Sequence, residues 1–543
     1  MTDVTTETVL SIRELSIALP KGADRALAVE GVSYEVMRGE IMCVVGESGS
    51  GKSMAANAIM GLLPKGVNAT QGEVLFEGQD LLALSEKQHR TLRGLKIGMI
   101  FQEPMTALNP LMRVGAQIAE VFEAHDQLTP KERQARALEL LIEVGIPQPE
   151  KAIRAYPFEL SGGQRQRVMI AMALALEPTL LIADEPTTAL DVTTQAQILA
   201  LIRDLQQRRG MAVMFITHDF GVVAEIASRV CVMRHGKIVE LGDARSVLKN
   251  PQDAYTQALI AAIPSNAVPP HRDIGQVAPL LEIKRLQKVF RSRGGWFKPA
   301  REVHALNDVS LTLARGETVG IVGESGSGKS TLGRCVVRLE HPDSGELLLD
   351  GVNLSQLKGD ALRRERHRVQ MIFQDPYASL NPRTKVGMAI AQGPIANGTP
   401  KAAALKRAGE LLDMVGLGAS AVERYPHEFS GGQRQRIGIA RALALDPELI
   451  VADEAVSALD VSIQAQVLEL LEELKQRLSL SLLFITHDLR VAAQLCDRIV
   501  VMQHGRIIEQ GSAEQIFLAP REAYTQDLLD AIPGREAPVA ATA

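Results

Sequence analysis

The sequence predicts an α/β fold that is repeated, so that one chain of 543 residues carries two domains of similar design. A glycine-rich octapeptide, GESGSGKS, occurs at residues 46–53 and again at residues 323–330. Each copy follows a short apolar run of the length of a buried strand and precedes a stretch with helical character. Short apolar runs alternate with helical stretches in the rest of both halves, which indicates strands covered by helices.

The octapeptides match the phosphate-binding pattern G-x-x-x-x-G-K-[ST] at every fixed position. Their glycines let successive backbone N–H groups turn inward around phosphate oxygens, and the following helix adds its positive end. We expect Lys52 and Lys329 to reach the outer phosphates, and Ser53 and Ser330 to bind Mg²⁺. The predicted nucleotide-binding residues are Gly46, Glu47, Ser48, Gly49, Ser50, Gly51, Lys52, Ser53, Gly323, Glu324, Ser325, Gly326, Ser327, Gly328, Lys329 and Ser330. A glycine turn that binds nothing is the alternative, and the second copy in register disfavours it.

Composition excludes several functional classes. A net charge of −5 and an aromatic content of 3% give no general attraction to nucleic acid and no platform for stacked bases. The four cysteines have no paired spacing, which disfavours a zinc site or a disulfide framework and fits a reducing compartment. No signal peptide is visible and no apolar run approaches a membrane span, so we expect that the chain does not itself cross a membrane.

The two halves match over nearly their whole length, and their boundaries follow from that match. We expect a first domain at residues 8–264, a linker at 265–279, a second domain at 280–533 and a flexible tail at 534–543. The linker is short and is not basic.

Each half also carries a helical insert. Thr129, Pro130 and Glu132 form a helix start with a capping box, and Gly145 is suited to the residue after the helix end. The predicted apolar face is Ala135, Leu138, Leu141 and Ile142. The counterpart in the second half starts at residues 399–400 and ends at residue 416.

Carboxylate pairs follow a buried-strand pattern in both halves. Asp184 and Glu185 end the first of these strands, and Asp453 and Glu454 end the second. An Asp at a strand end beside a phosphate loop can hold Mg²⁺, and the next Glu can polarise an attacking water. An acidic pair without a role is the alternative, and the upstream phosphate loops disfavour it.

A second glycine motif precedes a helical run in each half, as LSGGQRQR and FSGGQRQR. Its residues are Ser161, Gly162, Gly163, Gln164, Ser430, Gly431, Gly432 and Gln433. A helix start of this kind is another anion cradle, although a simple N-cap turn is the alternative. One nucleotide needs only one cradle from its own domain.

SGGQ between a phosphate loop and LLIADE resembles the signature of the ATP-binding cassette (ABC) family, and the resemblance covers both halves. It implies two tandem P-loop ATPase domains, each with a helical subdomain, and ATP and Mg²⁺ as cofactors. It further implies that Gln102 and Gln374 contact the metal and that His218 and His487 act with Glu185 and Glu454 in hydrolysis.

In that family two cassettes pack head to tail. The first site would then combine residues 46–53, Gln102, Asp184, Glu185 and His218 with Ser430–Gln433 of the other half. The second would combine residues 323–330, Gln374, Asp453, Glu454 and His487 with Ser161–Gln164.

A narrower resemblance rests on FQEPMTALNP and FQDPYASLNP and on the segments at residues 250–264 and 519–533, each of which contains AYTQ. These resemble the peptide and nickel importer subfamily. The resemblance implies two membrane permeases as partners, an indirect link to a periplasmic solute-binding protein, and a peripheral place on the cytoplasmic face of the inner membrane. Di- or oligopeptides are the expected solutes, with nickel or glutathione as alternatives. A sugar importer ATPase and a soluble double cassette acting on ribosomes or DNA are less favoured. Cysteines of an iron–sulfur cluster found in some members are missing here.

The adenine-binding residue is expected to differ between the halves. The resemblance implies an aromatic residue upstream of the phosphate loop, and Phe290 stands at that place in the second half. Leu19 is its counterpart in the first half. Trp296, Phe297 or Tyr34 could alternatively serve.

Overall fold

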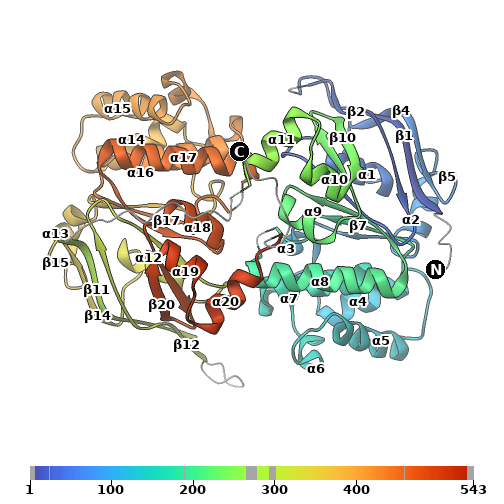
Figure 1. The fold of residues 1–543 in the computed structure, drawn as a ribbon, viewed down its shortest axis with the longest axis horizontal. Helices are drawn as coiled ribbons and strands as arrows, with labels where there is room; N and C mark the ends of the chain where they lie inside the picture. Colours follow the sequence, from blue (N-terminus) through green and yellow to red (C-terminus); the bar gives the residue numbers. More distant parts are fainter. Residues whose placement is uncertain are drawn as a thin grey trace. The chain divides into compact units, whose positions relative to one another are not determined.

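The computed structural model describes residues 7–23, 25–188, 190–263, 278–292, 301–457 and 459–534. The elements from β1 to α11 form one compact unit and those from β11 to α20 a second (Figure 1). Most of the expected linker and of the expected tail lies outside the described residues. Among the described residues, no helix combines the length and the apolar character that a membrane crossing requires.

The first unit contains two sheets. One is four-stranded and antiparallel in the order β2-β1-β4-β5. Its strands are β1 (Thr8–Ala18), β2 (Leu27–Met37), β4 (Asn68–Phe76) and β5 (Gln79–Asp80). The other is six-stranded in the order β10-β9-β3-β8-β7-β6, parallel except for β10. Its strands are β3 (Ile41–Val45), β6 (Ile97–Ile100), β7 (Leu180–Asp184), β8 (Ala212–Thr217), β9 (Arg229–Arg234) and β10 (Lys237–Asp243).

The central strand β3 separates two hydrophobic cores, because successive side chains of a strand point to opposite faces. Ile41, Cys43 and Val45 belong to the core shared with the helical part of the unit. Met42 and Val44 belong to the core beneath the antiparallel sheet. All five residues are buried, which explains why the strand reads as a continuous apolar run.

The helices of the first unit divide between the sheets and the helical insert. One group packs in the helical insert, where α4, α5 and α7 contact one another (Figure 1). The helices are α1 (Lys52–Met60), α2 (Glu86–Leu92), α3 (Pro104–Ala107), α4 (Val114–Glu123), α5 (Pro130–Glu143), α6 (Pro149–Ala152), α7 (Gly162–Ala173), α8 (Val192–Arg209), α9 (Phe220–Ile226), α10 (Ala244–Lys249) and α11 (Ala254–Ala261), with a 3-10 turn at Pro157–Glu159.

Helix α5 confirms the predicted start and corrects the predicted face. Thr129 is the N-cap and forms the capping box with Glu132. The buried residues are Ala137, Leu140 and Leu141, whereas Ile142 is 57% exposed. Only Leu141 was assigned to the correct face. The helix carries more apolar residues than one stripe can hold, so its periodicity does not select the buried set.

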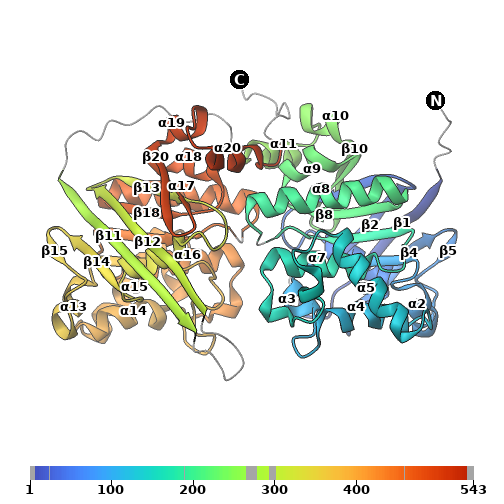
Figure 2. The ribbon, with the colours of Figure 1, turned by 90° about the horizontal axis from the view of Figure 1, so that it is seen from below.

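The second unit repeats this plan. Its antiparallel sheet has the order β12-β11-β14-β15 and its six-stranded sheet the order β16-β17-β18-β13-β19-β20. Figure 2 shows the long strands β11 and β12 side by side, in agreement with their antiparallel register. The strands are β11 (Pro279–Ser292), β12 (Arg301–Ala314), β13 (Thr318–Val322), β14 (Ser344–Leu349), β15 (Val352–Asn353), β16 (Val369–Ile372), β17 (Leu449–Asp453), β18 (Ser481–Ile485), β19 (Arg498–Gln503) and β20 (Arg506–Ser512).

Its helices likewise divide between the sheets and the insert, where α14, α15 and α16 contact one another. They are α12 (Lys329–Val336), α13 (Gly359–Glu365), α14 (Val386–Ala396), α15 (Lys401–Met414), α16 (Gly431–Leu443), α17 (Val461–Leu478), α18 (Leu489–Leu495), α19 (Ala513–Leu518) and α20 (Ala523–Asp530), with 3-10 turns at Ala419–Glu423 and Pro426–Glu428.

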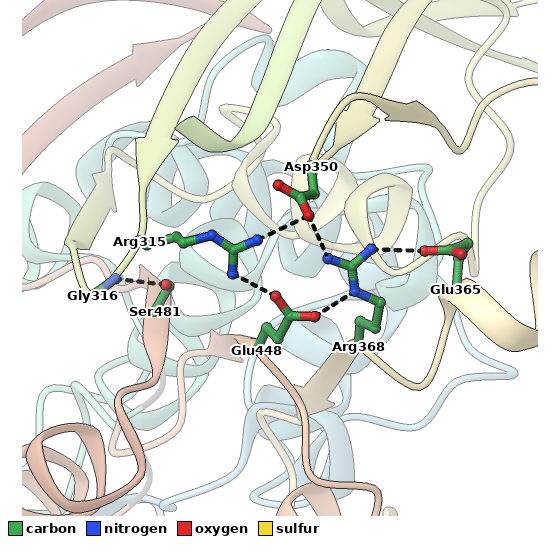
Figure 3. Close-up of polar contacts among 7 residues, drawn as sticks. All are labelled: Arg315, Gly316, Asp350, Glu365, Arg368, Glu448 and Ser481. Atoms are coloured by element: carbon green, nitrogen blue, oxygen red, sulfur yellow. Dashed lines mark hydrogen bonds and ion pairs between the residues drawn. The ribbon is translucent and has the colours of Figure 1, made fainter. Parts of the chain in front are cut away.

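Five charged side chains of the second unit form a network of ion pairs (Figure 3). Arg315 contacts Asp350 at 2.9 Å and Glu448 at 2.5 Å. Arg368 contacts Asp350 at 3.2 Å, Glu365 at 3.0 Å, and also Glu448. Because its members come from five separate segments, the network links β12, β14, α13, β16 and β17 at their ends.

Candidate functional site

The phosphate loops require glycine at two positions each. Gly46 has φ +149° and Gly51 has φ +105°, a region that side chains with a Cβ rarely adopt. A Cβ on Gly46 would stand 2.2 Å from the Met233 carbonyl oxygen, and one on Gly51 would stand 2.6 Å from that of Ala28. The second octapeptide repeats both constraints at its matching positions. The loop therefore lies directly against neighbouring backbone.

The loop lysines are folded back over their own loops. Lys52 Nζ donates to the carbonyl oxygens of the first two octapeptide residues at 2.6 and 2.9 Å, and Lys329 does so at 2.7 and 2.8 Å. Both side chains are buried to 4% exposure. Burial lowers the pKa of Lys329, whereas the nearby Glu454 carboxylate raises it. A phosphate group here would stabilise the charged form of each lysine.

The serine and aspartate predicted to hold a metal meet in both units. Ser53 Oγ donates to Asp184 Oδ1 at 3.0 Å, and Ser330 Oγ donates to Asp453 Oδ1 at 2.8 Å. Burial raises the pKa of Asp184 to about 6 and also raises that of Asp453. A cation beside these carboxylates would favour their ionised form. The donor set consists of oxygen atoms, which fits Mg²⁺.

Glu185 lies at the centre of the first site. Gln102 Nε2 donates to Glu185 Oε2 at 2.8 Å, and Thr188 Oγ1 donates to the same oxygen at 3.0 Å. His218 Nδ1 stands 3.4 Å from Glu185 Oε1. Burial by itself would raise the pKa of Glu185, but the hydrogen bond and charge of His218, with Lys52, lower it to about 2. Glu185 is therefore a carboxylate at neutral pH, the form that accepts a proton.

The second site has the same arrangement. Gln374 Nε2 donates to Glu454 Oε2 at 2.8 Å, and His487 Nδ1 stands 3.6 Å from that oxygen. Burial would raise the pKa of Glu454, but His487 lowers it overall. The Glu454 contact in turn raises the pKa of His487 against the opposing effect of burial. Glu185 and Glu454 share one further property, a left-handed backbone with φ of +46° and +47°.

The signature turns cap helices α7 and α16. Ser161 Oγ accepts from the Gln164 N–H at 3.3 Å, and Gln164 Oε1 accepts from the Ser161 N–H at 3.0 Å. Ser430 and Gln433 repeat this capping box at 3.4 and 3.0 Å. The capping box thus orients a helix N-terminus within each unit, the geometry that an anion cradle needs.

The parallel sheet explains why distant motifs meet. Strands β3, β6, β7 and β8 are neighbours or near neighbours and run in one direction. The phosphate loop, Gln102, Asp184 with Glu185, and His218 follow the ends of these strands in turn. All of them therefore stand at one edge of the sheet, where ligands of open α/β folds bind.

The predicted adenine-binding residue has a more exposed setting. Phe290 is 41% exposed, and Lys288 Nζ lies 5.2 Å from the centre of its ring. Tyr34 is only 3% exposed, with its hydroxyl 3.6 Å from Met214 Sδ, so it belongs to the core and is wrong as an alternative. Trp296 and Phe297 lie outside the described residues.

Sequence reasoning missed several residues that contact the phosphate loops, among them Thr193, whose Oγ1 donates to Glu324 Oε1 at 2.5 Å. Arg25 donates to the carbonyl oxygen of Gly49. The hydroxyls of Tyr255 and Tyr524 accept from loop N–H groups more than 190 residues away in sequence. The only available signal was that AYTQ occurs in both halves.

Comparison with known proteins gives the family. A model described as ABC transporter matches residues 29–188 and 306–457. A model described as oligopeptide/dipeptide transporter, C-terminal region, matches residues 239–294 and 508–541. Among solved structures, an ATP-binding cassette bound to ADP and Pi aligns with a TM-score of 0.39 at 30% identity, over 43% of this chain and 98% of that one.

Curated relatives match along most of their length. The peptidoglycan transport ATP-binding protein YejF of Agrobacterium fabrum is 48% identical over 535 residues, covering 98% of this chain and 97% of the relative. The glutathione import ATP-binding protein GsiA of Pectobacterium atrosepticum is 46% identical over 557 residues, covering 97% and 89%. This chain belongs to the ABC transporter family as an ATP-hydrolysing protein with two cassettes, each followed by the C-terminal region of oligopeptide/dipeptide transporters.

Proposed function

We propose that this chain is the double ATPase subunit of an importer for small peptides or peptide-bearing solutes. The observation that carries the proposal is the oligopeptide/dipeptide transporter region, which occurs in both halves. The similar proteins named for peptidoglycan transport and glutathione import support it, because each of those solutes contains a peptide part. Nickel or another small solute is the alternative.

In the proposed reaction, ATP lies on the phosphate loop and water attacks its terminal phosphate in line. Glu185 and Glu454 would accept the proton of that water, because each is ionised and oriented by a Gln and a His. Ser53, Gln102 and Asp184, or Ser330, Gln374 and Asp453, would hold Mg²⁺, which neutralises phosphate charge when bound. His218 and His487 would keep the Glu carboxylate in place and contact the γ-phosphate.

Each ATP would be completed by the signature turn of the other half, Ser430–Gln433 for the first site and Ser161–Gln164 for the second. The support is that each unit carries two helix starts suited to anions. Residues 8–264 and 280–533, produced separately, should each hydrolyse ATP poorly, and their mixture should recover activity. An isolated half that is monomeric and fully active would refute the shared sites.

The proposed partners are two membrane permeases, with a periplasmic solute-binding protein acting through them. We place the chain on the cytoplasmic face of the inner membrane as a peripheral subunit, with no nucleic acid partner. Co-expression with the permeases encoded beside its gene should allow co-purification in detergent. Purification with ribosomes and without any permease would favour the soluble double-cassette alternative.

Uptake by cells tests the solute directly. A strain that lacks the gene should fail to accumulate labelled dipeptides, glutathione or peptidoglycan peptides, and the wild-type gene should restore the solute that is carried. Variants Lys52→Ala and Lys329→Ala together should not restore it. Unchanged uptake of every peptide, with loss of nickel uptake, would contradict the peptide assignment.

A further inference from the structure

The C-terminal region of each cassette touches the phosphate loop through one tyrosine. The hydroxyl of Tyr255, in α11, accepts a hydrogen bond from the Glu47 N–H at 3.2 Å. The hydroxyl of Tyr524, in α20, accepts from the Glu324 N–H at 3.0 Å. The Tyr255 contact lies within the first unit, and the Tyr524 contact lies within the second. They join the second residue of the octapeptide to the region that distinguishes this chain from a bare cassette.

Tyr255 is held more firmly than Tyr524, which is partly buried in a helix whose start has no side-chain cap. Tyr255 is 8% exposed, and the start of its helix is fixed by Asp253, which accepts from the Tyr255 N–H at 2.8 Å. The guanidinium of Arg234 lies 4.6 Å from the centre of its ring. Burial raises the pKa of both Tyr255 and Tyr524 to about 12, so both hydroxyls are neutral at physiological pH.

The residue that each tyrosine holds carries the wrong charge for a phosphate site. Glu47 and Glu324 stand one position after the first glycine of the loop, and a carboxylate close to ATP phosphates would repel them. Besides burial, the carboxylates of Glu47 and Glu324 raise the pKa of Tyr255 and of Tyr524 through their charge and through a side-chain hydrogen bond. Each glutamate is held by the C-terminal region through its backbone N–H, and Glu324 Oε1 also accepts from Thr193 Oγ1 at 2.5 Å.

We propose that Tyr255 and Tyr524 are positioning residues of the two ATP sites: each hydroxyl fixes the second loop residue, keeps its carboxylate away from the phosphates and so preserves the phosphate-binding form of the loop. The inference rests on the proposed binding of ATP by the octapeptides. It gives the C-terminal region a role at the ATP site itself, through the contact of helices α11 and α20 with the loops.

The first test replaces both hydroxyls and keeps both rings. In the full chain assembled with its permeases, Tyr255→Phe with Tyr524→Phe should raise the KM for ATP by about two- to tenfold, the effect of losing one hydrogen bond at each site. The kcat should change by less, because the groups that contact the attacking water remain. Tyr34→Phe is the matched control, since it removes a buried hydroxyl from the core and should leave KM unchanged.

The second test asks whether the tyrosine acts through the glutamate. Adding Glu47→Ala and Glu324→Ala to the double Phe variant should return KM toward the wild-type value, because the carboxylate that was released is removed. A purely structural role of the hydroxyl predicts no such rescue. Thermal unfolding of all variants without nucleotide should stay near that of the wild type.

Two results would overturn the inference: an unchanged KM in the double Phe variant, or a KM that does not fall when the glutamates are removed from that variant. Both are distinct from failure of the proposed function, in which the wild-type complex itself would not hydrolyse ATP.

Discussion

The central strands of the two units, β3 and β13, occupy the same place in the sheet and fill it with different side chains. In β3, Cys43 is fully buried in the core shared with the helical part of the unit. Ala227, which follows helix α9, is partly buried in the same core and corresponds to Cys496, which follows helix α18. In β13 the strand position is Gly320, and a Cβ there would stand 2.8 Å from Cys496 Sγ. The first unit therefore has a cysteine on the strand and an alanine after the helix, and the second has a glycine on the strand and a cysteine after the helix. The total side-chain volume at the two positions stays similar.

The contacts at the ATP sites vary much less. The Ser–Asp distance is 3.0 Å in one unit and 2.8 Å in the other, and the Gln–Glu distance is 2.8 Å in both. The His–Glu distances are 3.4 and 3.6 Å. The cores therefore tolerate different residues of similar total volume, whereas the Ser–Asp, Gln–Glu and His–Glu pairs keep identical residue types because each contact depends on particular atoms.

The largest expected effect tests whether the two sites are equal in use as well as in geometry. Glu185→Gln and Glu454→Gln should lower ATP turnover to a similar degree, because each glutamate is oriented by a Gln and a His, and the double variant should lose roughly 100-fold or more while still binding ATP. ATPase assays of the assembled complex, with nucleotide binding measured separately, provide the comparison. Near-normal turnover of the double variant would refute the general-base role, and strongly unequal single variants would show that the sites differ in use.

The compensation between residues 320 and 496 can be tested by giving the second unit the residues of the first. Gly320→Cys should destabilise the second unit by about 1–3 kcal/mol, since a side chain is forced against Cys496 in a packed core. Adding Cys496→Ala recreates the arrangement of the first unit and should recover most of the loss. Hydrogen exchange of β13 and β18 is the suitable measurement, because unfolding of a two-unit chain is not a single transition. Equal damage with and without Cys496→Ala would contradict the volume argument.

A smaller effect is expected at the adenine end of the sites. Phe290→Ala should weaken nucleotide binding at the second site, and Leu19→Phe should strengthen it at the first, each by part of the ~1–3 kcal/mol that stacking on a base contributes. Titration of ATP with a probe specific to each site would measure both. Affinities that are equal and insensitive to both substitutions would remove Phe290 from the site.

The smallest effect concerns the charged network of Figure 3. In the first unit Glu77 stands 3.9 Å from Arg38 and 3.8 Å from Lys96, so its pairs are looser. Glu448→Gln should therefore cost the second unit about 1 kcal/mol, and Glu77→Gln should cost the first unit less, since partly exposed pairs are weak and screened. Native-state hydrogen exchange at low and high salt would compare them, and an equal cost in both units would show that the network adds nothing.

The network also gives a pH dependence with a definite sign. Hydrogen bonds from Arg368 and Arg315 lower the pKa of Glu448 and of Asp350 below the ordinary values of 4.5 and 3.8. Their contribution is complete above those ordinary values and is lost as the pH falls through the lowered ones. Below about pH 4 the difference between wild type and Glu448→Gln should shrink.

The residues that sequence reasoning selected from short motifs lie together in the structure. The octapeptides and the acidic pairs were located from the sequence alone, and the parallel sheet brings them to one edge. Sequence reasoning failed where tertiary packing chooses among similar residues, as on α5, where apolar residues occur on more than one face. It also missed Tyr255, which lies 208 residues from Glu47, because no local pattern records a contact of that range.

The backbone conformation of Glu185 and Glu454 has a consequence for engineering the stability of this chain. A left-handed conformation costs a residue with a Cβ about 1 kcal/mol or more, and glycine is free of that cost. Glu185 and Glu454 both hold it. Selection for heat resistance alone would therefore favour glycine at these two positions, and the proposed mechanism predicts that the resulting protein is more stable and lacks turnover. Any thermostable library of this chain needs an activity screen beside the heat step, because two of the positions where glycine would remove this cost are the proposed proton acceptors.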